Sequence, residues 1–365
     1  MKLKRTISFG AKTEMNWVDR NTQVSDLEGL FGQYTPDTLR SNHYLPEATT
    51  YATYGNVSHR PFEALSLQFG LRLEYAPISA TYKSGELVVD NTYLNLFPSG
   101  SAAYSFSEEE SITLSYRRSV SLPDIESLNP LRVRWSEFWE TAGNPDLRPE
   151  IMHRITVNYS KFWGEGNMWS LAPSFSTSKD DIQSSEEIND GITTSTSANF
   201  NGTDRIGGSA SFRLVPLEWL NVDVSIDINT TVNRGGTVSG DFYSSGTGYS
   251  MHGSVTVDLT ESLSWKVNGE YYKPATVGAS VNGAYITIRS SLRQQLFDDK
   301  LTIIASVNDP FNAQTWRRSF DSPEFRTEST SRWQSRYVGL DITYSFGTTP
   351  EMEEHDLPQG GGPRE

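Results

Sequence analysis

The fold is decided by the stretch from Tyr93 to Tyr159, which reads YLNLFPSGSAAYSFSEEESITLSYRRSVSLPDIESLNPLRVRWSEFWETAGNPDLRPEIMHRITVNY. Apolar and polar residues alternate, a long aromatic and proline-bearing segment follows, and the alternation then resumes. Within one predicted strand the two faces carry Ile112, Leu114 and Tyr116 on one side and Thr113, Ser115 and Arg117 on the other. An apolar face opposite a small or polar face is typical of a wall with lipid outside and water inside.

The composition agrees with such a wall. Hydrophobic residues make up 36% of the chain, and no apolar run approaches the roughly 18 residues of a membrane-spanning helix, which excludes a helical membrane protein. Aromatic residues make up 12%, which is high for so polar a chain. A membrane β-barrel combines these properties because only alternate residues of each strand meet lipid.

Charge and cysteine content exclude several classes of function. The absence of cysteine excludes disulfides, thiol catalysis and cysteine-based metal sites. The net charge of -14 argues against nucleic acid as a partner. Residues 1–17 lack the apolar core of a secretory signal peptide, so we expect the signal of an exported protein to lie upstream of Met1.

Alternation along the rest of the chain predicts an all-β fold, a transmembrane antiparallel up-and-down barrel with about 14 strands. The predicted strands cover residues 2–20, 45–60, 63–78, 92–107, 110–122, 150–163, 167–188, 192–214, 218–233, 247–259, 262–273, 283–296, 300–310 and 330–346. The residues predicted to point outward are Leu67, Leu71, Leu114, Val157, Val224, Ile226, Ile303, Leu340 and Ile342. Those predicted to point into the lumen are Thr113, Asn158, Asp223, Asp227, Asn268 and Asp341.

Connections between the predicted strands alternate between short and long. The short ones lie near residues 60–62, 107–109, 164–167, 216–218, 260–261 and 297–300. Short turns at one rim and longer loops at the other are typical of outer-membrane barrels, with the long loops extracellular and the turns periplasmic. This rule places both termini in the periplasm. Trp163, Trp169, Trp219 and Trp265 lie beside short turns and are interpreted as an aromatic girdle.

The order of several motifs carries a resemblance. FPS at 97–99, ITLSYRRSV at 112–120, LNP at 128–130 and GNPDLRPE at 143–150 resemble TonB-dependent outer-membrane receptors, within the outer-membrane beta-barrel family of Gram-negative bacteria. LFDDKLTIIASVNDPFN at 296–312 and YVGLDITYSFG at 337–347 resemble the last two strands of the same family. The family motif comprises Leu128, Asn129, Pro130, Gly143, Asn144, Pro145, Leu147, Pro149 and Glu150, to which we assign a structural role.

The resemblance implies a function and partners. Members of that family have a barrel of about 22 strands, a plug domain in its lumen and an N-terminal segment that engages the TonB protein, and they import metal chelates, vitamins or oligosaccharides. No part of this chain resembles the plug or the TonB-binding segment, so residues 1–347 are interpreted as the C-terminal part of such a barrel. The expected partners are therefore outer-membrane lipid, the barrel-assembly machinery, and the plug with the remaining strands. TonB would be reached through an N-terminal region that this sequence does not contain.

Few residues are candidates for binding or chemistry. Trp135, Phe138 and Trp139 lie in the long aromatic segment, where exposed rings can stack on sugars or flat chelates. A structural role is favoured over binding, either packing of the loop onto itself or a place in the interfacial aromatic girdle. His43, His59, His153, His252 and His355 show no metal-ligand spacing, and no pair of positioned carboxylates indicates acid–base catalysis. We therefore expect neither an enzyme nor a bound cofactor or metal.

Two alternatives remain beside the receptor barrel. One is a self-contained passive channel of about 14 strands, and the other is a glycan-binding surface β-protein. The apolar residues on one face of nearly every predicted strand disfavour the latter, because a sandwich would have to bury them in pairs. Residues 348–365 contain proline, glycine and acidic residues without periodicity, and they predict a disordered periplasmic tail.

Overall fold

The computed structural model describes residues 4–27, 32–82, 86–237, 240–276, 280–321 and 326–346, so the predicted tail at 348–365 lies outside the described residues. Most of the described residues form one 15-stranded antiparallel sheet, in which β2 (Arg20–Leu27) lies off the main path and pairs with β3. The path runs through β1 (Lys4–Trp17), β3 (Tyr34–Phe62), β4 (Leu65–Tyr82), β5 (Leu87–Ser105), β6 (Glu110–Ser121), β9 (Glu150–Trp163), β10 (Asn167–Lys179), β13 (Thr203–Leu217), β14 (Leu220–Thr237), β15 (Gly240–Thr260), β16 (Leu263–Lys273), β18 (Tyr285–Leu296), β19 (Leu301–Asn308) and β22 (Tyr337–Tyr344). This confirms the prediction of about 14 antiparallel strands in one sheet.

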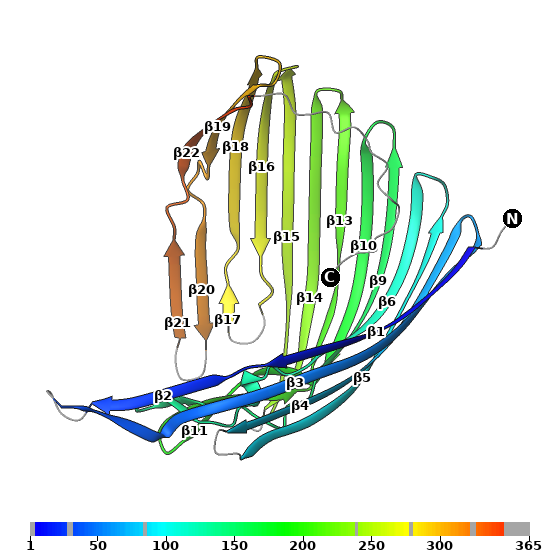
Figure 1. The fold of residues 1–365 in the computed structure, drawn as a ribbon. Coiled ribbons are helices and arrows are strands. Elements are labelled where there is room, and N and C mark those ends of the chain that lie inside the picture. Colours follow the sequence, from blue (N-terminus) through cyan, green and yellow to red (C-terminus); the bar gives the residue numbers. More distant parts are fainter. Residues whose placement is uncertain are drawn as a thin grey trace.

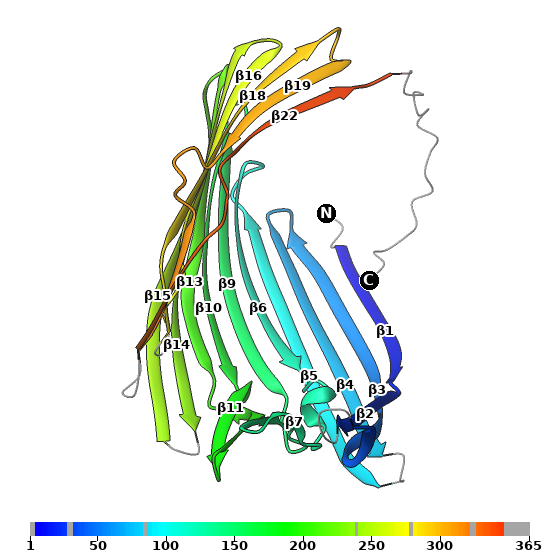
Figure 2. The same ribbon diagram turned by 90° about the vertical axis from the view of Figure 1, so that its left-hand side faces the viewer.

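The sheet is a curved wall (Figures 1 and 2). Its two edges are β1 and β22, and the described residues of these two strands do not pair with each other. Neighbouring strands pair in a regular register along the path, with four offsets beside the short turns or near strand ends. The register therefore fixes which side chains share a face across the whole wall.

One face of the wall is apolar and the other is polar. Cross-strand partners lie on the same side of a sheet. The apolar face is linked by pairs such as Leu114 with Val157, Phe212 with Val224, and Ile303 with Ile342. The polar face is linked by Thr113 with Asn158, Arg213 with Asp223, and Ser254 with Asn268. The predicted division of these residues between two opposite faces is confirmed.

The polar face is the concave one. Toward the end with the long connections, the concave face continues through Ile78, Ala80 and Val89. These three side chains are buried in one cluster with Leu128 and Leu147 of the segment between β6 and β9. Figure 2 shows that segment folded inside the curve of the wall. The apolar convex face is uncovered, with side chains such as Leu71 and Leu340 more than half exposed.

The ends of the wall differ as predicted. Short turns close one end, at the top of Figure 1, and the longer connections lie at the other. Gly164 and Gly166 form one short turn with φ of 54° and 86°, values that favour glycine. Trp163, Trp169 and Trp265 lie beside such turns, and the register places all three on the convex face.

The long connections hold more structure than the sequence predicts. β7 (Val133–Ser136), β8 (Trp139–Thr141), β11 (Asp181–Asn189) and β12 (Ile192–Phe200) form a second sheet in the order β11-β12-β8-β7. β17 (Ser280–Asn282), β20 (Thr315–Asp321) and β21 (Arg326–Arg332) form a third. β2 and the first residues of β3 likewise lie in the interval between the predicted strands 2–20 and 45–60.

Two predicted strands, 167–188 and 192–214, are each divided in two. The breaks fall at Asp180, with φ of 59°, and at Gly202, with φ of 115°. A Cβ at Gly202 would lie 2.0 Å from the carbonyl oxygen of Ser178, so only glycine fits this approach. The hairpin of β11 and β12 leaves the wall at these residues and joins the second sheet. Among the described residues no helix is long and apolar enough to cross a membrane.

Candidate functional site

The segment between β6 and β9 is held against the wall by its own motif. It contains a short 3-10 turn, η1 (Glu126–Leu128), followed by β7 and β8. Leu128 and Leu147 are almost fully buried beside Tyr44, Ile78 and Val89 of the wall. Burying these apolar side chains removes them from water, so the segment has a hydrophobic anchor at each end.

Backbone hydrogen bonds join the two halves of the motif. The N–H of Gly143 donates to the carbonyl of Asn129 (2.8 Å), and the N–H of Asn144 donates to the carbonyl of Ser127 (2.7 Å). A Cβ at Gly143 would lie 2.4 Å from the oxygen of Asn129. The close approach of two backbones therefore requires glycine at this position.

Polar side chains of the motif bind backbone groups of their own segment and of the hairpin formed by β11 and β12. Asn129 Oδ1 accepts from the N–H of Leu131 (3.1 Å), and Asn144 Oδ1 accepts from the N–H of Asp146 (2.9 Å). The amide of Asn144 donates to the carbonyl of Ser197 in β12 (3.1 Å), and Glu150 Oε1 accepts from the N–H of Ile182 in β11. The carbonyl of Pro145 accepts a hydrogen bond from Asn91 Nδ2 (2.7 Å). The rings of Pro130 and Pro149 are half-buried.

The candidate ligand-binding aromatics lie on the hairpin of β7 and β8. The rings of Trp135 and Trp139 are neighbours, with centroids 6.3 Å apart, and the indole N–H of Trp135 donates to Thr141 Oγ1 (3.0 Å). Both rings are exposed, as is Phe138. Among the described residues Phe138 makes no ring contact with either tryptophan, so the structure brings together two of the three aromatics.

A recess of about 740 Å³ opens beside Trp135. It is lined by Asp37, Arg132, Arg134, Trp135, Ser136, Glu137 and Glu140. An exposed indole beside both guanidinium and carboxylate groups can stack on a flat ligand and bind its polar edge. Sequence reasoning found the aromatic residues of this site but not its charged ones.

Glu140 is the buried charge of this recess. Its Oε1 accepts from the hydroxyl of Thr194 (2.9 Å) and from Arg132 Nη1 (2.6 Å). The Thr194 hydrogen bond lowers the pKa of Glu140, burial opposes this, and Arg132 lowers it further. Glu140 thus links β8 to β12, whose strands pair in parallel from Trp139 with Thr193 onward.

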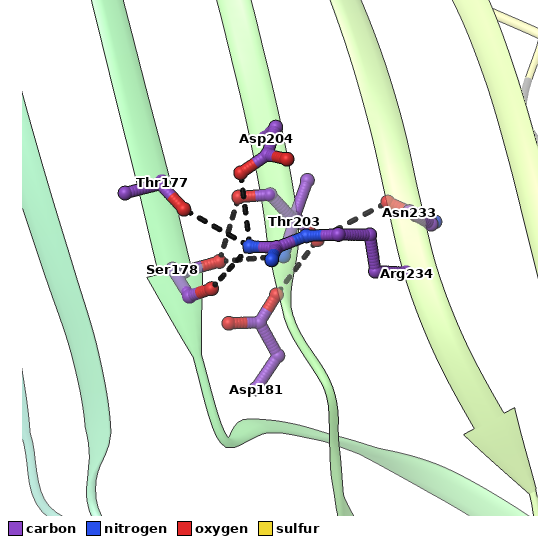
Figure 3. A network of polar contacts seen from close by, with 7 residues as sticks. All are labelled: Thr177, Ser178, Asp181, Thr203, Asp204, Asn233 and Arg234. Carbon is purple, nitrogen blue, oxygen red and sulfur yellow. Dashed lines mark hydrogen bonds and ion pairs between the residues drawn. The ribbon is translucent and has the colours of Figure 1, made fainter.

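A polar network closes the point where β11 and β12 leave the wall (Figure 3). Arg234 Nη2 donates to Asp204 Oδ1 (2.9 Å), Thr177 Oγ1 (3.0 Å) and the carbonyl of Ser178 (3.2 Å). The N–H of Thr203 donates to Ser178 Oγ (2.9 Å), and the hydroxyl of Thr203 donates to Asp181 Oδ2 (2.7 Å). These bonds tie the ends of β10, β13 and β14 together.

The concave face of the wall is hollowed toward β1. A recess of about 460 Å³ there is lined mainly by small and polar residues such as Ser8, Asn56, Ser99 and Ser115, with Arg117 and Arg154 among them. A second recess of about 620 Å³ lies further along the wall and includes Arg205. No group of three or more His, Asp or Glu side chains suited to a metal ion occurs within the described ranges.

Solved structures similar to this chain are named as transporters and receptors. The copper transporter OprC has a TM-score of 0.68 and 13% identity over 94% of this chain and 54% of its own. The ferric enterobactin receptor PfeA of Pseudomonas aeruginosa has a TM-score of 0.58 and 16% identity over 87% of this chain and 47% of its own. The ferric yersiniabactin uptake receptor FyuA of Yersinia pestis has a TM-score of 0.60 and 14% identity over 94% and 51%.

These likenesses establish the fold. The chain spans about half the length of the solved structures that it matches. No curated protein sequence matches it. Residues 1–344 match the sequence model of the outer membrane protein beta-barrel family. That match covers nearly the whole chain, and together with the curved two-faced sheet it shows that the chain belongs to the outer membrane protein beta-barrel family.

Proposed function

We propose that this chain forms part of the wall of an outer-membrane receptor that imports a scarce nutrient in a TonB-dependent manner. The observation that carries the proposal is the uninterrupted division of the sheet into an apolar convex face and a polar concave face. Lipid covers such a convex face and water fills such a lumen. We take metal chelates as the first candidate cargo, ahead of vitamins and oligosaccharides, because structural relatives are named as a copper transporter and as receptors for ferric enterobactin and ferric yersiniabactin.

We further propose the orientation of the wall. The short-turn end faces the periplasm, and the end with the second and third sheets faces the outside. Outer-membrane barrels place short turns in the periplasm and long loops outside, which supports this orientation. The recess beside Trp135 and Trp139 would then be open to extracellular solutes. In this arrangement a plug and further strands complete the receptor, the barrel-assembly machinery inserts it, and the TonB protein acts through a region outside this chain.

Uptake by cells tests the function. A strain that lacks the complete gene is compared with its complemented parent for accumulation of ferric enterobactin, ferric yersiniabactin, Cu²⁺, a cobalamin and a labelled oligosaccharide. We expect accumulation of one cargo to be lost with the gene and also on loss of the TonB protein. Uptake that persists without TonB, together with steady single-channel current from the purified chain, would replace the receptor with the passive channel.

The aromatic site has a test in the same strain. We expect Trp135→Ala in the complementing gene to raise the cargo concentration for half-maximal uptake by about tenfold, equivalent to ~1.4 kcal/mol of binding free energy. Trp219→Ala is the matched control, because Trp219 is also exposed but lies at a short turn. Equal uptake by both variants would show that Trp135 only packs its loop.

A further inference from the structure

Three arginines lie in one row across the concave face. Arg117 of β6 pairs in register with Arg154 of β9. Arg154 pairs with Ser176 of β10, and Ser176 pairs with Arg205 of β13. The three residues are far apart in the sequence, and only the register of four consecutive strands brings them into line.

The arginines of this row have no counter-charge. Elsewhere on the concave face Arg72 forms an ion pair with Glu74, and Arg213 forms one with Asp223 (2.7 Å). Within the described part of the chain Arg117, Arg154 and Arg205 form no ion pair or hydrogen bond, and all three are exposed. Like charges directly opposite each other on adjacent strands destabilise a sheet. Arg117 and Arg154 are such a pair, so the empty wall carries an electrostatic cost at this row.

The surroundings of Arg117 and Arg154 favour an external anion over a protein carboxylate. From β6 to β13 the neighbouring concave rows are uncharged: Ser115, Thr156, Ser174 and Gly207 on one side, and Ser119, Met152, Ser178 and Thr203 on the other. Arg117 and Arg154 line the recess of about 460 Å³, and Arg205 lines the one of about 620 Å³. Space and neutral hydrogen-bonding groups therefore adjoin Arg117 and Arg154, whose recess contains no carboxylate. The recess of Arg205 is also lined by Glu150 and Asp181, although neither forms an ion pair with Arg205.

We propose that Arg117, Arg154 and Arg205 form a binding site on the lumen wall for a small solute that carries two or more carboxylate or phosphate groups. A guanidinium group binds either group with two parallel hydrogen bonds. Adjacent strands lie roughly 4.8 Å apart, so Arg117 and Arg154 suit one anionic group together, while Arg205, two strands further on, suits a second about 10 Å away. Ser99, Ser115 and Thr156 supply hydroxyl donors beside the first position.

The inference rests on the proposed function only where it takes this solute to be cargo, because the binding site itself is a property of the wall. Its test is equilibrium binding to the purified 365-residue chain in detergent micelles. Isothermal titration calorimetry at low ionic strength is used, because salt screens exposed charges. The probes are citrate for carboxylates and pyrophosphate for phosphates.

We expect saturable binding of at least one probe. Arg117→Gln and Arg154→Gln should each weaken it at least tenfold, and Arg205→Gln should weaken it less. The matched control is Arg213→Gln, which removes an arginine of the same face whose charge Asp223 already neutralises. It should leave binding unchanged. In the absence of ligand, the triple glutamine variant should melt at a higher temperature than the parent chain, because it lacks the repulsion between the arginines. The preferred probe should raise the melting temperature of the parent chain but not that of the triple variant.

Several results would overturn the site. These are no saturable binding to the parent chain, equal binding to the triple variant, or an equal loss in Arg213→Gln. The melting experiment guards against misfolding, because a variant that has lost its sheet shows no cooperative transition. The two proposals can also fail separately. If citrate or pyrophosphate binds in an arginine-dependent manner but the complete gene supports no uptake, the site is supported and the proposed function is contradicted.

Discussion

The phenol of Tyr93 in β5 donates a hydrogen bond to the backbone carbonyl of Leu147 (2.9 Å), 54 residues further along the chain. Tyr93 belongs to the wall, and Leu147 belongs to the segment that folds inside its curve. The bond thus fixes the position of the candidate ligand-binding hairpin relative to the lumen. It acts beside the buried side chain of Leu147, where an unpaired carbonyl would be costly.

Tyr93→Phe should loosen this segment without unfolding the wall. Loss of the hydrogen bond is expected to cost about 1 kcal/mol, since the ring remains and the carbonyl of Leu147 loses a partner. Hydrogen exchange should therefore speed up at the amides of Gly143 and Asn144. Tyr104→Phe is the control, because the hydroxyl of Tyr104 forms no hydrogen bond among the described residues and its ring packs edge-on against Phe106. Equal exchange in both variants would refute the role of the bond.

Gly143→Ala should destabilise the same segment by a steric mechanism. The added methyl would lie 2.4 Å from the carbonyl oxygen of Asn129 and 2.7 Å from that of Ser127. Both are backbone atoms, so overpacking of about 1–3 kcal/mol is expected. Limited proteolysis should then cut within residues 122–149. Gly269→Ala in β16 is the control, because its methyl would meet nothing within 4 Å and should leave the protease pattern unchanged.

The sequence was sufficient for the wall because alternation is a local signal. β4, β6 and β14 follow from their own residues, and the register then carries their faces across the sheet. The sequence was not sufficient where the backbone conformation of a single residue decides where a strand leaves the sheet. The break at Gly202 depends on contact with Ser178 across the chain, which no periodicity reveals.

The candidate site was predictable only in part for the same reason. Trp135 and Trp139 are conspicuous in a polar sequence, and the segment that holds them was visible as an interruption of alternation. Glu140 gains its importance from Thr194, 54 residues away. The arginine row needs four paired strands before it exists. Contacts of such long sequence separation follow from the topology, and a sequence pattern does not carry them.

The second sheet should weaken at acid pH through Glu140. Because its pKa is lowered in the folded chain, its contribution to stability is present above the unfolded value of about 4.3 and is lost as the pH falls through the folded value. Hydrogen exchange across residues 192–196, corrected for the intrinsic rate, should therefore accelerate below about pH 4. Glu140→Gln should remove this dependence, whereas Glu137→Gln, which changes an exposed neighbour, should preserve it. A parent chain whose corrected exchange is independent of pH would contradict the assignment.

The two-faced wall itself is tested by placing one charge on either face at neighbouring positions. Val224 lies on the convex face, paired with Phe212, and Ser225 lies on the concave face, paired with Ser211 and His252. Arginine at Val224 should cost roughly 2–4 kcal/mol if the residue lies near the bilayer midplane, because lipid would have to solvate the guanidinium group. Arginine at Ser225 meets lumen water and should cost much less. The measurement is the urea concentration at the midpoint of folding into lipid vesicles. Folding is monitored by the difference in gel mobility between the heated and the unheated chain. In detergent-free urea both variants should be unfolded alike, which isolates the effect of lipid. Equal midpoints for the two variants, or a larger loss for Ser225→Arg, would reverse the assignment of the lipid-facing side.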